Sequence, residues 1–129
     1  MTDPIADLLT RIKNGYMAHL DSIEVVHSNV KEALIRLLSK YGYVGEVVKN
    51  TTDGRTTMTI KLMYPQGQPA ITEVKRVSKP GLRRYIKVRD LDTVRQSLGH
   101  VILSTPAGLK THAEARKENV GGEIVCFVW

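Results

Sequence analysis

The chain has 129 residues, the length of one ordinary domain or two very small ones, and 42% of them are hydrophobic. Its 19 basic and 13 acidic residues give a net charge of +6, which favours an anionic partner. The hydrophobic content excludes a disordered basic tail, and the single cysteine, Cys126, excludes a disulfide framework. A lone thiol, no long apolar run and no signal-like N-terminus predict a cytoplasmic protein.

The first half of the chain is predicted to fold as αβαββ. Apolar residues at helical spacing from Ile5 to Tyr16 predict a helix, and 23–27 predict a short strand. A second helix follows, capped by Ser28 or by Asn29, with Glu32 able to complete a capping box from Asn29. Its buried face is expected to hold Val30, Ala33, Leu34, Leu37, Leu38 and Tyr41. Two strands are predicted to form a hairpin that turns at Asp53-Gly54.

The second half is predicted to form a separate domain with a different layout. Two prolines and a glycine interrupt the periodicity at 65–69, so we expect an N-terminal α/β domain over 1–64, a linker over 65–69 and a C-terminal domain over 70–129. The C-terminal domain is predicted to be mostly β, with short helices over 91–98 and 112–118. Its predicted strands cover 70–77, 82–89, 101–104 and 123–129. The predicted fold class is therefore α/β of the α+β kind, in two small domains.

Most of the basic charge lies in the second half, where residues 75–89 hold seven basic side chains and no acidic one. Alternation from Leu82 to Arg89 predicts a half-buried strand with Leu82, Ile86 and Val88 inward. Its outward side chains would be Arg83, Tyr85, Lys87 and Arg89. Cations contact phosphates and an aromatic ring stacks on a base or sugar, so this face suits RNA. A basic face that simply meets water is the alternative.

The sequence offers little for catalysis. It contains no nucleotide-binding glycine motif and no nucleophile elbow, and its histidines lack metal-ligand spacing. We therefore expect no enzyme, no metal and no other cofactor. Cys126 lies in an apolar strand and is predicted to be an inert buried thiol. The alternative from another class is a small hydrolase using Ser104 with His112 and Glu114, although no sequence pattern brings these side chains together.

Residues 101–108 carry two adjacent hydroxyls, those of Ser104 and Thr105, from an apolar strand into a turn that contains Gly108. A hydroxyl both donates and accepts hydrogen bonds, so the pair can contact base edges, 2′-hydroxyls or phosphates. A plain turn with a serine or threonine cap is the alternative interpretation of this pattern.

Four segments, in this order and spacing, resemble the bacterial form of family eight of the universal small-subunit ribosomal proteins. They are the opening TDPIADLLTRIKNGY, the segment RVSKPGLR with Tyr85, the loop VILSTPAG, and an ending from Ala115-Arg116 through VGGEIVC. The resemblance covers residues 2–129. It implies a structural constituent of the small (30S) ribosomal subunit, a primary binding protein for the central domain of 16S ribosomal RNA that helps to assemble the platform.

The resemblance also implies partners and site residues. The fifth and twelfth small-subunit ribosomal proteins are the implied neighbours, and in the alternative function the same surface binds the protein's own operon mRNA and represses translation. The residues implied to face splayed bases or to shape their site are Ser104, Thr105, Gly108 and Glu123. Those implied to meet the RNA backbone are Lys79, Arg83, Tyr85 and Lys87. Secondary contacts are implied for Arg11, Asn14 and Lys31.

Two positions depart from the family's pattern. The family has a third hydroxyl where this chain has Pro106, and an apolar residue where this chain has Lys110. Proline removes both the hydroxyl and a backbone donor. Our hypothesis is that Pro106 stiffens the turn and that Lys110 supplies a compensating contact to an RNA phosphate.

Overall fold

The computed structural model describes residues 3–93 and 99–129 and confirms the predicted α+β class. The chain divides into two compact units, one of Pro4–Thr72 and one of Glu73–Trp129 to which Asp3 also belongs. The division between the two units falls after Thr72. The linker expected over 65–69, as the boundary between two functional domains, stays a prediction. In the described part of the chain, no helix is long and apolar enough to span a membrane.

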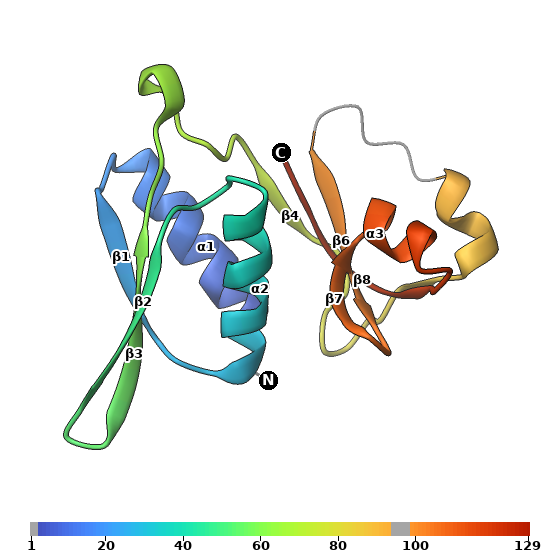
Figure 1. Cartoon of the computed structure of the whole chain (residues 1–129), viewed down its shortest axis with the longest axis horizontal. Coiled ribbons are helices and arrows are strands. Elements are labelled where there is room, and N and C mark those ends of the chain that lie inside the picture. The colour runs from blue at the N-terminus through green and yellow to red at the C-terminus, as the bar shows by residue number, and fades with distance from the viewer. Residues whose placement is uncertain (1–2, 94–98) are drawn as a thin grey trace. The chain divides into compact units, whose positions relative to one another are not determined.

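The first unit follows the predicted αβαββ order (Figure 1). Its elements are α1 (Pro4–Met17), β1 (Ser22–Val26), α2 (Asn29–Lys40), β2 (Val47–Thr52), β3 (Arg55–Lys61) and the 3-10 helix η1 (Pro65–Gly67). The strands form an antiparallel sheet in the order β1-β3-β2. The hairpin turns at Asp53 and Gly54, whose φ angles of 54° and 76° are those that a tight two-residue turn requires.

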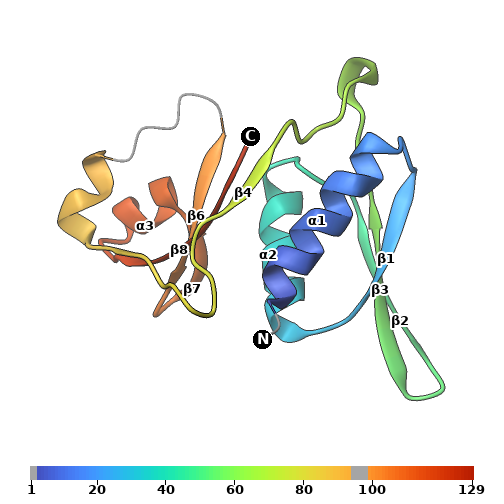
Figure 2. The ribbon, with the colours of Figure 1, turned by 180° about the vertical axis from the view of Figure 1, so that it is seen from behind.

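Both helices of the first unit lie on the same side of its sheet, as Figure 1 and the reverse view in Figure 2 show. The core between helices and sheet consists mainly of Leu8, Ile12, Leu34, Ile35, Leu38, Met58 and Ile60, each fully buried. The periodicity of α1 and β3 therefore predicted their buried faces correctly. In α2 the prediction was wrong for Val30 and Ala33, which are exposed because the face of the helix that enters the core is formed by Leu34, Ile35, Leu37 and Leu38. Ser28 is the N-cap of this helix.

The second unit is an antiparallel sheet with short helices. Its elements are β4 (Val74–Arg76), β5 (Tyr85–Ile86), the 3-10 helix η2 (Val88–Thr93), β6 (His100–Thr105), β7 (Gly108–Thr111), α3 (His112–Lys117) and β8 (Gly122–Val128). The strand order is β4-β8-β6-β7, and β5 pairs with β8 on the same edge as β4. A register shift between Ile102 and Leu103 marks a bulge against β8.

One face of this sheet carries the core of the second unit. Leu91, Val101, Leu103 and Ala115 form a buried cluster to which η2 and α3 contribute. The capping box predicted for α3 is present, because the Thr111 hydroxyl accepts from the Glu114 amide at 3.3 Å and the Glu114 carboxylate accepts from the Thr111 amide at 2.9 Å. This cap fixes the start of α3 directly after β7.

Two predictions for this unit need correction. The strand predicted over 82–89 is only two residues long, because the chain pairs with β8 at Gly122 and Glu123 and turns into η2 at Val88. Leu82, predicted to point inward, is 56% exposed. The helix predicted over 91–98 begins earlier, as η2, and its remainder at 94–98 lies outside the described residues.

Candidate nucleic-acid interface

Three side chains predicted from the sequence to bind RNA lie in one row across the second sheet. Glu123 on β8 pairs with Ser104 on β6 and with Tyr85 on β5. Paired residues of neighbouring antiparallel strands project from the same face, so the three side chains share one face. Tyr85 is 72% exposed and Ser104 is exposed, which leaves a phenol and a hydroxyl open to a ligand on either side of a carboxylate.

The row depends on two glycines that precede Glu123. A Cβ atom on Gly122 would overlap the carbonyl oxygen of Ser104, and one on Gly121 would come within 2.5 Å of the carbonyl oxygen of Ile86. Only glycine allows the start of β8 to lie this close to both β5 and β6. The glycine pair in the sequence thus sets the spacing between Tyr85, Glu123 and Ser104.

Arg83 joins this row through an ion pair. One guanidinium nitrogen donates to the Glu123 carboxylate at 3.0 Å, and the Arg83 side chain remains 52% exposed. This hydrogen bond to Glu123 is the main cause that raises the pKa of Arg83. Glu123 therefore holds the Arg83 guanidinium beside the row, whereas the resemblance implied only that Glu123 faces splayed bases or shapes their site.

The basic segment before β5 is a closed loop. The Ser78 hydroxyl accepts from the Arg84 amide at 2.8 Å and donates to the Arg84 carbonyl oxygen at 3.2 Å, and Ser78 is fully buried. Lys79 and Leu82 exchange two backbone hydrogen bonds of 2.9 Å, so the chain reverses over Pro80 and Gly81. No sequence pattern indicated the role of Ser78, because its partner lies across a turn that period-two alternation does not predict.

The predicted backbone-binding lysines of this segment are exposed. Lys79 lies on the closed loop, and Lys87 follows β5 directly. Arg83 and Lys87 flank Tyr85 along the chain, and Arg89, the third cation expected on this face, is exposed but lies in η2 rather than on a strand.

The hydroxyls of Ser104 and Thr105 have different surroundings. Thr105 is 9% exposed, and its hydroxyl donates to the Gly108 carbonyl oxygen at 2.8 Å and accepts from the Ala107 amide at 3.1 Å. These bonds close the two-residue turn that links β6 to β7. Pro106 is the first of the two turn residues, where the fixed φ of proline is favourable, and Gly108 after the turn has a φ of 108°.

Lys110, the other departure from the family's pattern, lies on β7. Its ammonium is 3.2 Å from the carboxylate of Glu118 at the end of α3, and its side chain is 26% exposed. A phosphate contact by Lys110 would therefore share the ammonium with Glu118.

Three predicted site residues belong to the first unit. Arg11 and Asn14 are exposed on α1, away from its buried stripe. The ammonium of Lys31, on α2, donates to the Val26 carbonyl oxygen at 3.3 Å.

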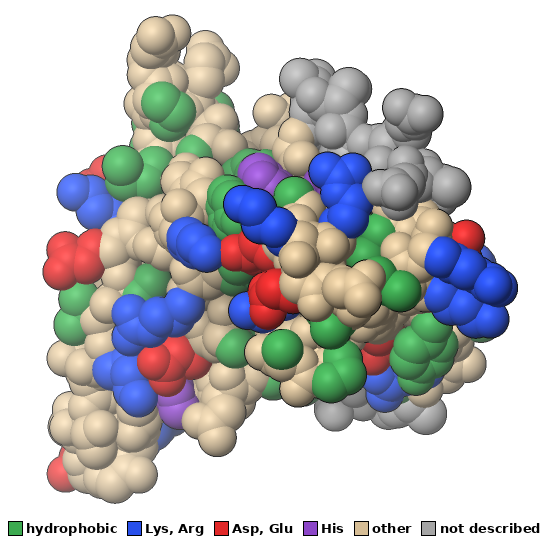
Figure 3. Space-filling view, turned by 45° about the vertical axis from the view of Figure 1, so that its right-hand side comes forward, with side chains coloured by type: hydrophobic (Ala, Val, Ile, Leu, Met, Phe, Trp, Pro, Cys, Tyr) green, Lys and Arg blue, Asp and Glu red, His purple; other side chains and the backbone are tan. Residues whose placement is uncertain are grey.

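The sequence did not reveal a charged cluster on the first unit. Glu32 lies 2.7 Å from His27, 3.2 Å from Lys49 and 3.2 Å from Arg36. These partners, with the His27 hydrogen bond first, lower the pKa of Glu32 to about 2. Figure 3 shows basic side chains beside acidic ones over this unit. The cluster depends on β2 lying next to α2, which spacing along the chain does not predict.

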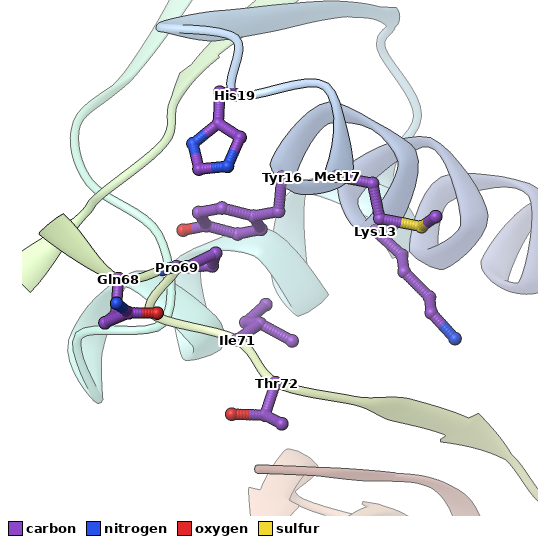
Figure 4. A pocket seen from close by; sticks show the side chains of 8 residues that line it. All are labelled: Lys13, Tyr16, Met17, His19, Gln68, Pro69, Ile71 and Thr72. Atoms are coloured by element: carbon purple, nitrogen blue, oxygen red, sulfur yellow. The ribbon is translucent and has the colours of Figure 1, made fainter.

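A hollow of about 300 Å³ also lies in the first unit, between the end of α1 and the chain after η1. Figure 4 shows Tyr16, Met17 and Ile71 among the side chains around it. The Tyr16 hydroxyl donates to the Tyr43 carbonyl oxygen at 2.6 Å and accepts from the Met63 amide at 3.1 Å, so it serves the fold. Burial is the main cause that raises the pKa of Tyr16.

Of the three residues considered for hydrolysis, the two that would act with Ser104 have other partners. His112 accepts from the Val101 amide through Nδ1 at 3.3 Å, and Glu114 completes the cap of α3. Cys126 is buried, as predicted, and its desolvation raises the pKa of the thiol to about 12, which disfavours the reactive thiolate. The described residues contain no group of three side chains suited to hold a metal ion.

Comparison with known proteins bears on the whole chain. The sequence model of the family described as ribosomal protein S8 matches residues 3–129. Relatives named small ribosomal subunit protein uS8 are 48% identical over 130 residues in Streptococcus pneumoniae, 46% over 132 in Mycoplasmopsis synoviae and 44% over 135 in Persephonella marina. These alignments cover 100% of this chain and 98–99% of each relative.

Proposed function

The chain belongs to the ribosomal protein S8 family, and from this premise we propose that it binds the central domain of 16S ribosomal RNA directly and early, and helps to assemble the platform of the small subunit. Its place is the small ribosomal subunit, and its family consists of ribosomal structural proteins and not of enzymes. The hydrolase interpretation is therefore dropped.

The observation that carries the proposal is the row of Tyr85, Glu123 and Ser104 beside the cations of the closed loop. A stacking ring, a hydroxyl and a carboxylate can recognise the edges and faces of unpaired bases. The neighbouring cations supply the salt-dependent attraction to phosphates that all RNA shares. Specificity and affinity thus come from adjacent but different side chains.

We assign the roles within this surface as follows. Ser104 and Tyr85 contact a splayed base or its sugar, and Glu123 positions Arg83 for a phosphate. Thr105 and Gly108 shape the turn from inside, since the Thr105 hydroxyl is already bonded to the turn's backbone. The backbone-binding cations are Lys79, Arg83 and Lys87, with Lys110 as a further contact that competes with Glu118.

The first unit adds secondary contacts through Arg11, Asn14 and Lys31. The fifth and twelfth small-subunit proteins are the proposed protein neighbours, and the cytoplasm is the proposed compartment. An operon mRNA that presents the same irregular helix would occupy the same surface, which makes translational repression the second candidate function.

A gel-shift titration with a central-domain 16S RNA fragment, at several salt concentrations and with competitor transfer RNA, tests the proposal. We expect specific binding that persists over the competitor. Ser104→Ala should weaken cognate binding by about 1–3 kcal/mol, whereas Lys87→Ala should weaken cognate and competitor binding alike and reduce the salt slope by up to about one. Lys61→Ala, an exposed cation on the sheet of the first unit, is the matched control. Equal affinity for any duplex RNA would contradict the proposal.

A further inference from the structure

Leu82 is a large apolar side chain directly after the turn of the basic loop (residues 79–83), and it is 56% exposed. Tyr85, three residues later, is 72% exposed. A single exposed leucine needs no explanation in an ordinary surface. Here, however, two of the most exposed large hydrophobic side chains of the described residues lie in the basic segment 75–89, which holds seven basic residues. Their exposure in such a segment therefore needs an explanation.

The backbone at Leu82 is held in place before any ligand arrives. Leu82 exchanges two hydrogen bonds of 2.9 Å with Lys79, and buried Ser78 closes the loop onto Arg84. A further bond joins the Ile124 amide to the Arg84 carbonyl oxygen at 2.9 Å, which ties the loop to β8. An apolar group on such a loop loses little conformational freedom when it is buried against a partner.

The charges around Leu82 indicate the chemistry of that partner. Lys79, Arg83 and Arg84 are exposed neighbours of Leu82 along the chain. These cations attract a polyanion, whereas the Leu82 side chain contributes favourable binding free energy only when it is buried against an apolar surface. A nucleotide offers both within a few ångströms, because its phosphate is charged and the faces of its sugar and base are apolar.

We propose that Leu82 packs against the sugar or base face of an unpaired nucleotide while the flanking cations hold that nucleotide's phosphates. The proposal rests on the proposed function and adds an uncharged contact to it. Apolar side chains such as leucine are used as wedges against bases by nucleic-acid-binding proteins.

The salt dependence of binding separates this contact from the cationic ones. Leu82→Ala should weaken cognate RNA binding by about three- to tenfold at every salt concentration, because an apolar contact releases no counterions. Leu82→Met should retain most of the affinity, since methionine keeps the apolar volume. Val48→Ala, on an exposed valine of the first unit, should have no effect. Urea unfolding of Leu82→Ala should match the wild type, because the removed atoms are largely exposed.

The outcomes distinguish the two proposals. If the wild-type protein binds the RNA specifically and Leu82→Ala binds equally well, the Leu82 contact is refuted and the function stands. If the wild-type protein shows no specific binding, the proposed function fails first. A changed salt slope in Leu82→Ala would assign the loss to displaced cations and also refute the contact.

As an independent measurement, a photoreactive diazirine analogue of leucine at position 82 should cross-link to an unpaired nucleotide. Cross-linking only to base-paired segments, or none, would overturn the proposal.

Discussion

Ser78→Ala tests whether the basic loop is held by one buried hydroxyl. In the wild-type protein this hydroxyl accepts from the Arg84 amide and donates to the Arg84 carbonyl oxygen, at 2.8 and 3.2 Å. Alanine keeps the Cβ atom and the packing but removes both bonds. The loop from Lys79 to Arg83 then keeps its turn, the backbone hydrogen bonds of Ser78 and Arg84 to Ile124, and the ion pair of Arg83 with Glu123.

The magnitude follows from the two bonds. A neutral hydrogen bond contributes about 0.5–1.5 kcal/mol net, so the pair contributes about 1–3 kcal/mol. Because Arg84 is exposed and its carbonyl oxygen keeps the Ile124 amide, water and that bond offset part of the loss. We therefore expect Ser78→Ala to lower the free energy of opening the loop by about 1–2 kcal/mol, which raises the open population about 5–30-fold.

Amide hydrogen exchange of Lys79 and Leu82, measured by NMR, reports this opening directly. Both amides donate within the loop, so both should exchange faster in Ser78→Ala. Ser39→Ala is the matched control, because the Ser39 hydroxyl also bonds to a backbone carbonyl, that of Gly45 at 2.9 Å, but lies in the first unit. Wild-type exchange rates for the two loop amides in Ser78→Ala would refute our account of the loop.

Two further predictions concern stability. The lowered pKa of Glu32 means that its carboxylate stabilises the folded state above about pH 4.5, and that this contribution is lost as the pH falls toward about 2. The thermal midpoint of Glu32→Gln should therefore lie below that of the wild type at pH 6 and converge with it near pH 2. Glu46→Gln is the control, and a pH-independent difference for Glu32→Gln would contradict the assignment. Gly122→Ala should reduce the free energy of unfolding in urea by about 1–3 kcal/mol, because its Cβ would overlap the Ser104 carbonyl oxygen. Gly81→Ala, with open space at its Cβ, should be near neutral, and equal stabilities of the two variants would count against the close approach of β8 to β6.

Sequence patterns predicted those elements whose stabilising contacts join residues only a few positions apart in the chain. The stripe of α1, the hairpin at Asp53-Gly54 and the capping box of Thr111 and Glu114 each depend on residues a few positions apart. Their periodicity or turn chemistry is complete within the segment itself. For that reason these elements are present as predicted.

The alternation around Leu82 predicted a strand that long-range pairing cuts short. Two-residue periodicity carries no information on where the partner strand ends, and β8 offers β5 only Gly122 and Glu123. The hydrogen bond of Ser78 to Arg84 then closes residues 79–83, which come before β5, into a loop, and Leu82 on that loop is exposed. Likewise, either Ser28 or Asn29 could cap α2 from sequence alone. The apolar residues of α2 also did not show that Ile35, rather than Val30 and Ala33, would face the core, because packing against the sheet selects the buried side.

The candidate site was predictable as a set of residue types but not as an arrangement. Tyr85, Ser104 and Glu123 were identified separately, and the sheet aligns them in one row. The ion pair between Arg83 and Glu123 joins residues 40 positions apart and could not be found by spacing. The same reason hid the cluster around Glu32, where Lys49 comes from β2.

The glycine pair before Glu123 has a consequence for protein engineering. Copying Tyr85, Ser104 and Glu123 onto three strands of another antiparallel sheet would not reproduce their spacing, because ordinary residues at the start of the central strand would push its neighbours apart. A successful transplant must also carry two positions without side chains. To transfer this surface, an engineer must therefore reproduce its backbone geometry, because the three side chains alone do not define it.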